Sequence, residues 1–128
     1  MNEIYVSIDG DSIGKIIERY ILITALDDLK QFSQMLQDDI LLISEQLKAN
    51  GGTVHMQGGD NILASLDKNA VNPIIAFIEK INQNRQYHFS VGLGNSPVDS
   101  YLSLKYAKLT KISPIIYSSD SKFSVYSE

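Results

Sequence analysis

The first residues of the chain alternate between apolar and polar side chains. Residues 3–9, EIYVSID, place Ile4, Val6 and Ile8 on one face, while the opposite face ends at Asp9. Alternation with a period of two predicts a half-buried β-strand over residues 3–9 that ends at an acid.

Apolar residues spaced by three and four follow, which is the period of an amphipathic helix. They predict a short helix over residues 13–23 and then a longer one, whose apolar positions are Leu29, Phe32, Leu36, Ile40, Ile43 and Leu47. The sequence Asn50-Gly51-Gly52 ends the longer helix, because glycine is favoured just beyond helix C-termini.

The second half of the chain predicts a hairpin, two helices and three further strands. The hairpin joins residues 53–57 to 61–66 through Gly58-Gly59-Asp60. A helix over 71–81, a strand over 86–94, a helix over 96–111 with Pro97 in its first turn, and short strands over 113–118 and 122–127 complete the chain. The first six elements follow the split βαβ order, βαββαβ. We therefore expect an α+β, ferredoxin-like fold with an added C-terminal helix and short strands, in a single domain over residues 1–128.

Composition and charge exclude several classes of function. The net charge of −4 argues against direct binding of DNA or RNA. The N-terminus has no basic segment typical of a signal peptide, and no apolar run reaches the ~20 residues of a membrane span, so we expect a cytoplasmic protein without direct membrane insertion. The chain has no cysteine, which excludes disulfides and thiolate metal sites.

Two acids stand where neighbouring strands of such a sheet can meet. Asp9 ends the first strand, and Asp60 lies at the hairpin tip. Two adjacent carboxylates repel each other unless a cation lies between them, and Mg²⁺ suits one or two carboxylates together with phosphate oxygens. Gly58 and Gly59 permit positive φ in the turn and allow a bulky nucleotide to approach the backbone. The simpler alternative is a hairpin that carries an acid at its turn.

The GDSIG sequence, residues 10–14, follows the first strand and opens a helix. Asp11 or Ser12 is predicted to cap this helix, and the free N–H groups of its first turn are suited to a triphosphate. By itself, the pattern is equally typical of a turn with a helix cap.

Lysines and histidines offer further candidates. Lys105, Lys108 and Lys111 are spaced by three on a predicted helix, which by itself is typical of a solvated face. His55 and His88 lie in different strands without metal-ligand spacing, so we expect structural roles for both.

Three short motifs together resemble a known superfamily. SIDGDSIG, QGGDNIL and SVGLG with YLSLKYAK are similar to the nucleotide-cyclase palm superfamily, which includes GGDEF diguanylate cyclases and the large polymerase subunit of type III CRISPR complexes. The chain looks most similar to the stand-alone minimal CRISPR polymerases (mCpol). The resemblance runs from about residue 4 to residue 117.

The resemblance implies roles for individual residues. Asp9 and Asp60 match the catalytic acids that bind two Mg²⁺ or Mn²⁺ ions, with the carbonyl of Gly10 or Ile8 as a further ligand. Lys108 matches the lysine that binds the triphosphate, and Lys111 is a second candidate. The remaining nucleotide-binding positions lie in the two motif loops: Asp11, Ser12, Ile13, Gly14, Gly58, Gly59 and Asn61.

Asn61 departs from the family pattern, because relatives usually carry Glu or Asp there. An asparagine is neutral and offers a metal only its amide oxygen. Asp11 is the nearest acid that could compensate, although we expect its side chain to point away from Asp9 in a strand.

The resemblance also implies a function. It indicates an enzyme that joins nucleoside triphosphates, with ATP favoured, into a cyclic oligonucleotide of cyclic di-adenylate type and releases pyrophosphate. It further implies a homodimer, a role in antiphage signalling, and a product that acts on a separate, membrane-bound effector. Two alternatives remain open: a palm module that binds nucleotide without turnover, supported by Asn61, and a diguanylate cyclase that uses GTP.

Overall fold

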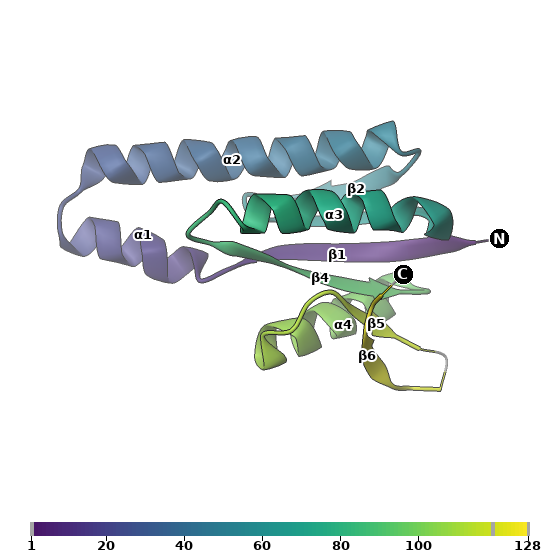
Figure 1. Cartoon of the computed structure of the whole chain (residues 1–128). Helices are drawn as coiled ribbons and strands as arrows, with labels where there is room; N and C mark the ends of the chain where they lie inside the picture. The colour runs from purple at the N-terminus through teal and green to yellow at the C-terminus, as the bar shows by residue number, and fades with distance from the viewer. Residues whose placement is uncertain (1, 119, 128) are drawn as a thin grey trace.

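The computed structural model describes residues 2–118 and 120–127 and contains a mixed six-stranded sheet. The strand order is β2-β3-β1-β4-β5-β6, and every neighbouring pair is antiparallel except β4 and β5. The strands are β1 Glu3–Asp11, β2 Thr53–Gln57, β3 Asn61–Asp67, β4 His88–Gly94, β5 Ile115–Tyr117 and β6 Phe123–Val125. Because β1 lies between β3 and β4, the first four strands have the predicted ferredoxin-like arrangement (Figure 1). The α+β prediction is confirmed.

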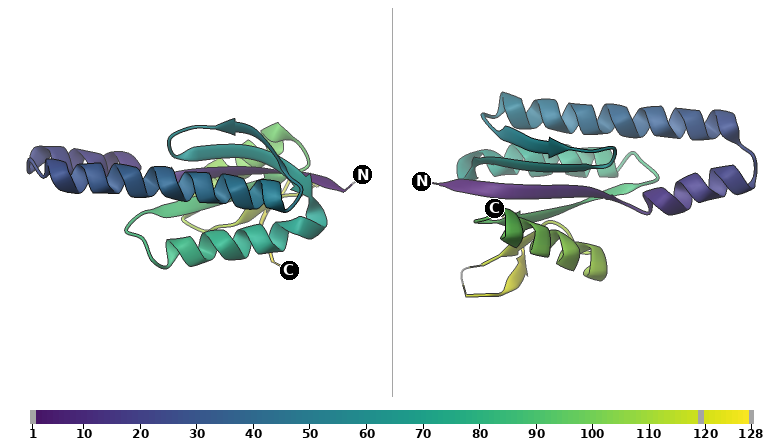
Figure 2. Two further views of the ribbon diagram at one scale, coloured as in Figure 1. Left: turned by 90° about the horizontal axis from the view of Figure 1, so that it is seen from above. Right: turned by 180° about the vertical axis from the view of Figure 1, so that it is seen from behind.

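The described residues form four α-helices, three of which cover the two faces of the sheet. They are α1 Ile13–Leu22, α2 Leu26–Ala49, α3 Val71–Asn82 and α4 Pro97–Thr110, with a short 3₁₀ turn η1 at Lys68–Ala70. The helices α2 and α3 lie on one face, and α4 lies on the other (Figure 1). Figure 2 shows that α1 and the first part of α2 form a helical hairpin that extends beyond the sheet. None of the described helices has the length and apolar character of a membrane span.

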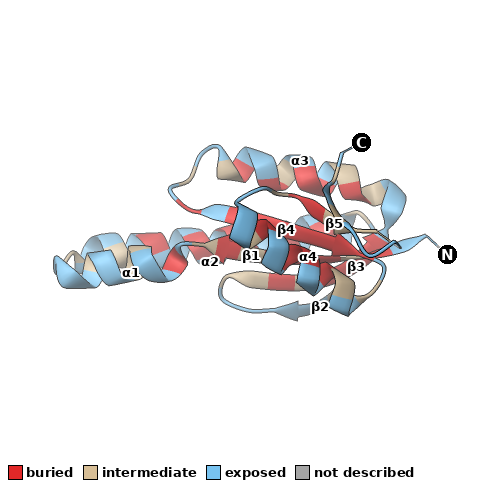
Figure 3. Cartoon of the chain, turned by 90° about the horizontal axis from the view of Figure 1, so that it is seen from below, coloured by how far each residue is buried: buried red, intermediate tan, exposed pale blue. Residues whose placement is uncertain are grey.

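The alternation of β1 separates the two faces. Ile4, Val6 and Ile8 are almost fully buried in the core formed with α2 and α3, and Figure 3 shows the buried residues concentrated on the central strands. On the opposite face, Ser7 shares a 2.8 Å hydrogen bond with Ser100 of α4. Burial of the apolar face is the main favourable contribution to folding. The candidate functional side chains lie on the polar face.

Two glycines of β4 allow α4 to pack directly on the sheet. A Cβ atom at Gly92 would lie 2.2 Å from the backbone nitrogen of Leu104, and one at Gly94 would lie 2.6 Å from the nitrogen of Ser100. No side chain fits in that space. The position of α4 on the sheet therefore depends on Gly92 and Gly94.

Two local predictions are wrong: the strand end at Asp9, and the helix cap at Asp11 or Ser12. The strand β1 continues through Asp11, and Ser12 precedes α1 in the left-handed region (φ 65°) without a side-chain capping bond, so neither residue caps the helix. Neither hairpin glycine has positive φ; among the described glycines that conformation occurs at Gly51 (φ 82°), just after α2. Gly58 has another role, because a Cβ there would lie 2.2 Å from Asn61 Oδ1.

A buried ionic cluster was not predicted from the sequence. Asp39 of α2 is 1% exposed and accepts hydrogen bonds of 2.8 and 3.0 Å from Nε and Nη2 of Arg85. Tyr87 also donates a hydrogen bond to Asp39. Burial raises the pKa of Tyr87, and the hydrogen bond to Asp39 raises that pKa further. The cluster ties α2 to the segment that connects α3 with β4.

Candidate functional site

The two predicted acids meet at one edge of the sheet. Asp9 of β1 is directly opposite Asn61 of β3, so the hairpin turn lies beside the end of β1. The backbone N–H of Gly10 donates a 2.9 Å hydrogen bond to the carbonyl of Asp60. The β1–β3 pairing thus brings Asp9 and Asp60 together, as their positions in the strand order predicted.

The electrostatics of this pair favour a cation. Burial raises the pKa of Asp60, and the charge of Asp9 and a hydrogen bond with it raise that pKa further. The positive charge of Lys108 and a backbone hydrogen bond oppose the shift. Two carboxylates in this arrangement lose their mutual repulsion when a positive ion binds between them.

Lys108 reaches this acidic edge from α4. Its ammonium lies 2.9 Å from Asp9 Oδ2, 3.1 Å from Asp11 Oδ1 and 3.2 Å from the carbonyl oxygen of Gly10. Burial by itself lowers the pKa of Lys108, but the hydrogen bonds to the two aspartates and their negative charge outweigh it, and the pKa is raised. Lys105, one turn earlier, lies over the exposed ring of Tyr101 instead, with Nζ 5.3 Å from the ring centroid. Of these two lysines, Lys108 is the one that contacts the acids.

Asp11 points to the same side of β1 as Asp9, so the expectation that it points away is wrong. Residues two apart in a strand share a face, and β1 extends as far as Asp11. Besides Lys108, Asp11 accepts a hydrogen bond from Ser90 Oγ, and its Oδ2 lies 3.6 Å from His88 Nδ1. His88 therefore lies beside Asp11, and its Nε2 is 3.3 Å from Asn82 Nδ2. The signal that identifies it is the β1–β4 register, in which Asp11 is paired with His88.

A cleft with several cationic side chains adjoins Lys108. It has a volume of about 500 Å³, and we call it the cationic cleft; its lining residues are Asp11, Ser12, Lys15, His88, Ser90, Lys108 and Lys111. Four of the nucleotide-binding positions that the resemblance implies line this cleft: Asp11, Ser12, Lys108 and Lys111.

A second cavity lies between the helical hairpin and the turn that carries Asp60. We call it the hairpin cavity; its volume is about 350 Å³, and its lining residues are Ile13, Gly14, Ile17, Ser33, Leu36, Gln37, Gly59 and Asp60. A Cβ atom at Gly14 or Gly59 would meet nothing within 4 Å. The absence of side chains at these two glycines leaves open space beside Asp60.

Comparison with known proteins identifies the family. The family model of the minimal CRISPR polymerase domain (mCpol) matches residues 5–117. The chain belongs to the mCpol family. No protein in the curated set matches this chain.

Solved structures of cyclases share the fold of this mCpol chain. A bacterial light-regulated adenylyl cyclase matches with a TM-score of 0.61 and 12% identity, over 90% of this chain and 42% of the cyclase chain. The GGDEF domain of DgcB from Caulobacter crescentus, solved with c-di-GMP, matches with a TM-score of 0.59 and 11% identity, over 84% of this chain and 72% of that domain. The guanylyl cyclase Cya2 matches with a TM-score of 0.55 and 10% identity, over 81% and 69% of the two chains. The mCpol chain therefore has the palm fold of nucleotide cyclases.

The oxygen donors of the mCpol site fit a divalent metal. Asp9 and Asp60 supply carboxylates, and Gly10 supplies a carbonyl oxygen that already accepts a hydrogen bond from an ammonium group. Mg²⁺ and Mn²⁺ prefer such oxygen ligands, and Mg²⁺ is commonly bound by one or two carboxylates plus water and phosphate oxygens. Across residues 2–118 and 120–127, no group of three or more His, Cys, Asp or Glu side chains is arranged to hold a metal.

Asn61 does not present a free oxygen to the mCpol site. Its Oδ1 is buried beside Gly58 and has no hydrogen-bond partner among the described residues. The residue borders a small pocket of about 150 Å³ together with Asp9. In this conformation the amide oxygen of Asn61 is not exposed to a bound ion.

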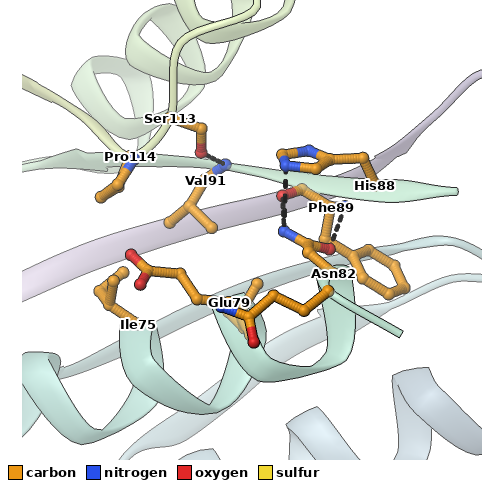
Figure 4. A pocket seen from close by; sticks show the side chains of 10 residues that line it. Ile75, Glu79, Asn82, His88, Phe89, Val91, Ser113 and Pro114 are labelled. Atoms are coloured by element: carbon orange, nitrogen blue, oxygen red, sulfur yellow. Dashed lines mark hydrogen bonds between the residues drawn. The ribbon is translucent and has the colours of Figure 1, made fainter. Parts of the chain in front are cut away.

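A further pocket of the mCpol chain lies apart from these acids. This space has a volume of about 300 Å³. Its lining side chains come from α3, from β4 and from the segment with Ser113 and Pro114 (Figure 4). Two of its polar side chains support the fold: Asn82 exchanges hydrogen bonds of 2.8 and 3.0 Å with the backbone of Phe89, and Ser113 Oγ accepts a 2.8 Å hydrogen bond from Val91 N–H. Neither Asp9 nor Asp60 lines this pocket, so we assign no chemistry to it.

Proposed function

We propose that this chain, as a single palm domain over residues 1–128, joins nucleoside triphosphates into a cyclic oligonucleotide and releases pyrophosphate. One observation carries the proposal: Asp9, Asp60 and the Gly10 carbonyl meet directly beside a cleft lined by lysines. Membership of the mCpol family and the fold shared with nucleotide cyclases support it.

In the proposed reaction the protein positions the reactants. Asp9, Asp60 and the Gly10 carbonyl hold the metal ions, while Lys108 and Lys111 hold the β- and γ-phosphates in the cationic cleft. When bound, two Mg²⁺ or Mn²⁺ ions lower the pKa of the attacking ribose hydroxyl and neutralise charge on the phosphates. The N–H groups at the start of α1, from Ile13 onward, add further donors toward phosphate oxygens. Most of the rate enhancement then comes from orientation and electrostatic stabilisation.

The choice of substrate and partners rests on the family resemblance. We propose ATP as the preferred substrate, a product of cyclic di-adenylate type, and a role in antiphage signalling through a separate, membrane-bound effector. Joining two nucleotides favours a homodimer in which two sites face each other. The exposed apolar side chains at the α1–α2 junction, Ile21, Leu22, Ile23 and Leu26, support a protein contact.

A turnover assay tests the proposal. The protein is incubated with each nucleoside triphosphate and Mg²⁺ or Mn²⁺, and the products are analysed by mass spectrometry together with pyrophosphate release. We expect a cyclic product from ATP, and a loss of at least about 100-fold in rate for Asp9→Asn and Asp60→Asn. Asp38→Asn, on the exposed surface of α2, is the matched control and retains the rate. Full activity of either site variant contradicts the metal assignment.

A second candidate is a palm module that binds nucleotide without turnover. The buried Oδ1 of Asn61, at the position where relatives carry an acid, favours this candidate. Measurable triphosphate binding without product or pyrophosphate supports the module and contradicts the polymerase. A 3′,5′-linked product formed from GTP identifies a diguanylate cyclase instead.

A further inference from the structure

The ammonium of Lys108 lies where three oxygen atoms from consecutive residues converge. Asp9 Oδ2, the Gly10 carbonyl oxygen and Asp11 Oδ1 lie 2.9, 3.2 and 3.1 Å from Nζ. An ammonium has three N–H donors, and here each has an oxygen partner. The end of β1 therefore forms a cation position that the protein fills with its own lysine.

Two of these three groups are also the ones that fit a divalent metal. A metal bound by the Asp9 carboxylate and the Gly10 carbonyl uses oxygens that now accept hydrogen bonds from Lys108. At metal–oxygen distances of about 2.1 Å, the ion would lie within a few ångströms of the ammonium. Because like charges at that separation repel each other in a half-buried site, the ammonium and the metal ion compete for these oxygens.

The Lys108 side chain can also adopt a position in the cationic cleft. It lines the cationic cleft, and its side chain is 34% exposed, so a rotation of that side chain toward the cleft needs no movement of the sheet. The partner that it leaves, Asp11, keeps the hydrogen bond from Ser90. The ammonium can therefore exchange the carboxylates for another anion without leaving a buried charge unpaired.

We propose that the Lys108 ammonium occupies the cation position in the nucleotide-free protein and thereby couples metal binding to triphosphate binding. In the nucleotide-free protein it fills the cation position and weakens metal binding. When a triphosphate enters the cationic cleft, Lys108 moves to the phosphates and vacates the oxygens of Asp9 and Gly10. Metal affinity then rises with nucleotide, and by linkage nucleotide affinity rises with metal by the same factor. This inference rests on the proposed function, since it takes the metal and triphosphate sites from it.

Metal titration without turnover tests the inference. Mn²⁺ binding to the nucleotide-free protein is measured by electron paramagnetic resonance for the wild type, Lys108→Met and Lys108→Gln. We expect both variants to bind Mn²⁺ more tightly than the wild type, by about tenfold or more, because a competing charge has been removed. Lys105→Met removes the same charge one turn earlier on α4, away from the acids, and keeps wild-type affinity. Circular dichroism verifies that every variant is folded.

A second titration adds a non-hydrolysable ATP analogue. We expect the analogue to tighten Mn²⁺ binding in the wild type and to have a several-fold smaller effect in Lys108→Met. Equal or weaker Mn²⁺ binding by the nucleotide-free Lys108 variants overturns the inference, as does the absence of measurable Mn²⁺ binding by all proteins. Wild-type protein that makes no product while Lys108→Met gains metal affinity contradicts the proposed function and supports the inference. If the wild type forms product but Lys108→Met gains no Mn²⁺ affinity, the proposed function is supported and the inference is overturned.

Discussion

Lys108 of α4 donates a 2.9 Å hydrogen bond to Asp9 of β1, a residue 99 positions earlier in the chain. Neither residue reaches the other unless α4 packs closely on the sheet. That packing depends on Gly92 and Gly94 of β4, where α4 backbone atoms occupy the space of a side chain. The site is therefore sensitive to changes beneath α4 that touch no functional group.

We expect Gly92→Ala to lower the free energy of unfolding and to disrupt the contact between Lys108 and Asp9. Its Cβ would lie 2.2 Å from Leu104 N and 2.3 Å from the carbonyl of Ser100, and neither backbone atom can move without shifting α4. Overpacking of this kind costs about 2–3 kcal/mol of the free energy of unfolding, measured by urea denaturation. As the control, Gly14→Ala adds a methyl group in open space and leaves the stability equal or slightly higher. Wild-type stability of Gly92→Ala would contradict the packing argument.

Asp60→Asn is expected to stabilise the metal-free protein near neutral pH. The folded-state pKa of Asp60 is raised above its ordinary value of 3.8. A raised pKa means that the favourable contribution of the protonated group is complete below pH 3.8 and is lost as the pH rises through the folded-state pKa. An asparagine cannot ionise and escapes that loss.

Thermal unfolding in a chelator measures the effect of Asp60→Asn. Because solvent screens this half-buried group, we expect the variant to gain only about 1–3 °C in Tm at pH 7. The gain disappears at pH 3. Excess Mn²⁺ reverses the order at pH 7, because the metal stabilises the wild type through its carboxylate. A wild type that is more stable than Asp60→Asn in chelator at pH 7 would disprove the repulsion between Asp9 and Asp60.

Asp39→Asn is expected to destabilise the fold without touching the site. The substitution leaves the guanidinium of Arg85 and the hydroxyl of Tyr87 without their buried charged partner. Breaking a buried ion pair from one side costs about 3 kcal/mol or more. Urea denaturation at pH 7 measures the loss, and Asp38→Asn, the exposed neighbour, changes the stability by less than about 0.5 kcal/mol. Similar stabilities of the two variants would show that the cluster contributes little.

Asn61→Asp tests how the asparagine at position 61 affects stability and metal affinity. A carboxylate opposite Asp9 adds negative charge beside Asp60, in a position where the present Oδ1 is buried. We expect a lower Tm in chelator, because the new charge is desolvated and repelled. We also expect Mn²⁺ to bind several-fold more tightly by isothermal titration calorimetry, because the site gains a charge. Unchanged Mn²⁺ affinity would show that position 61 does not act on the metal site.

Much of the fold followed from the sequence alone, because its signals are local. Alternation over residues 3–9 and apolar spacing over the later helices determine the βαββαβ order, since each element buries its own apolar face. The positions of Asp9 in the first strand and of Asp60 at the hairpin turn follow from the same patterns, although β1 continues two residues further, through Asp11. Once the order is known, the pairing of β1 with the hairpin brings these two acids together. The family resemblance added Lys108, which periodicity alone left on a solvated helix face.

Only the tertiary structure decided which groups contact these acids. The β1–β4 register puts His88 and Ser90 beside Asp11, and the close packing of α4 on Gly92 puts Lys108 on Asp9 and not merely near it. The burial of Asp39 with Arg85 likewise depends on segments 46 positions apart. These contacts join residues that share no local pattern. Register and helix docking are settled by the packing of the whole core, and no stretch of sequence contains that information by itself.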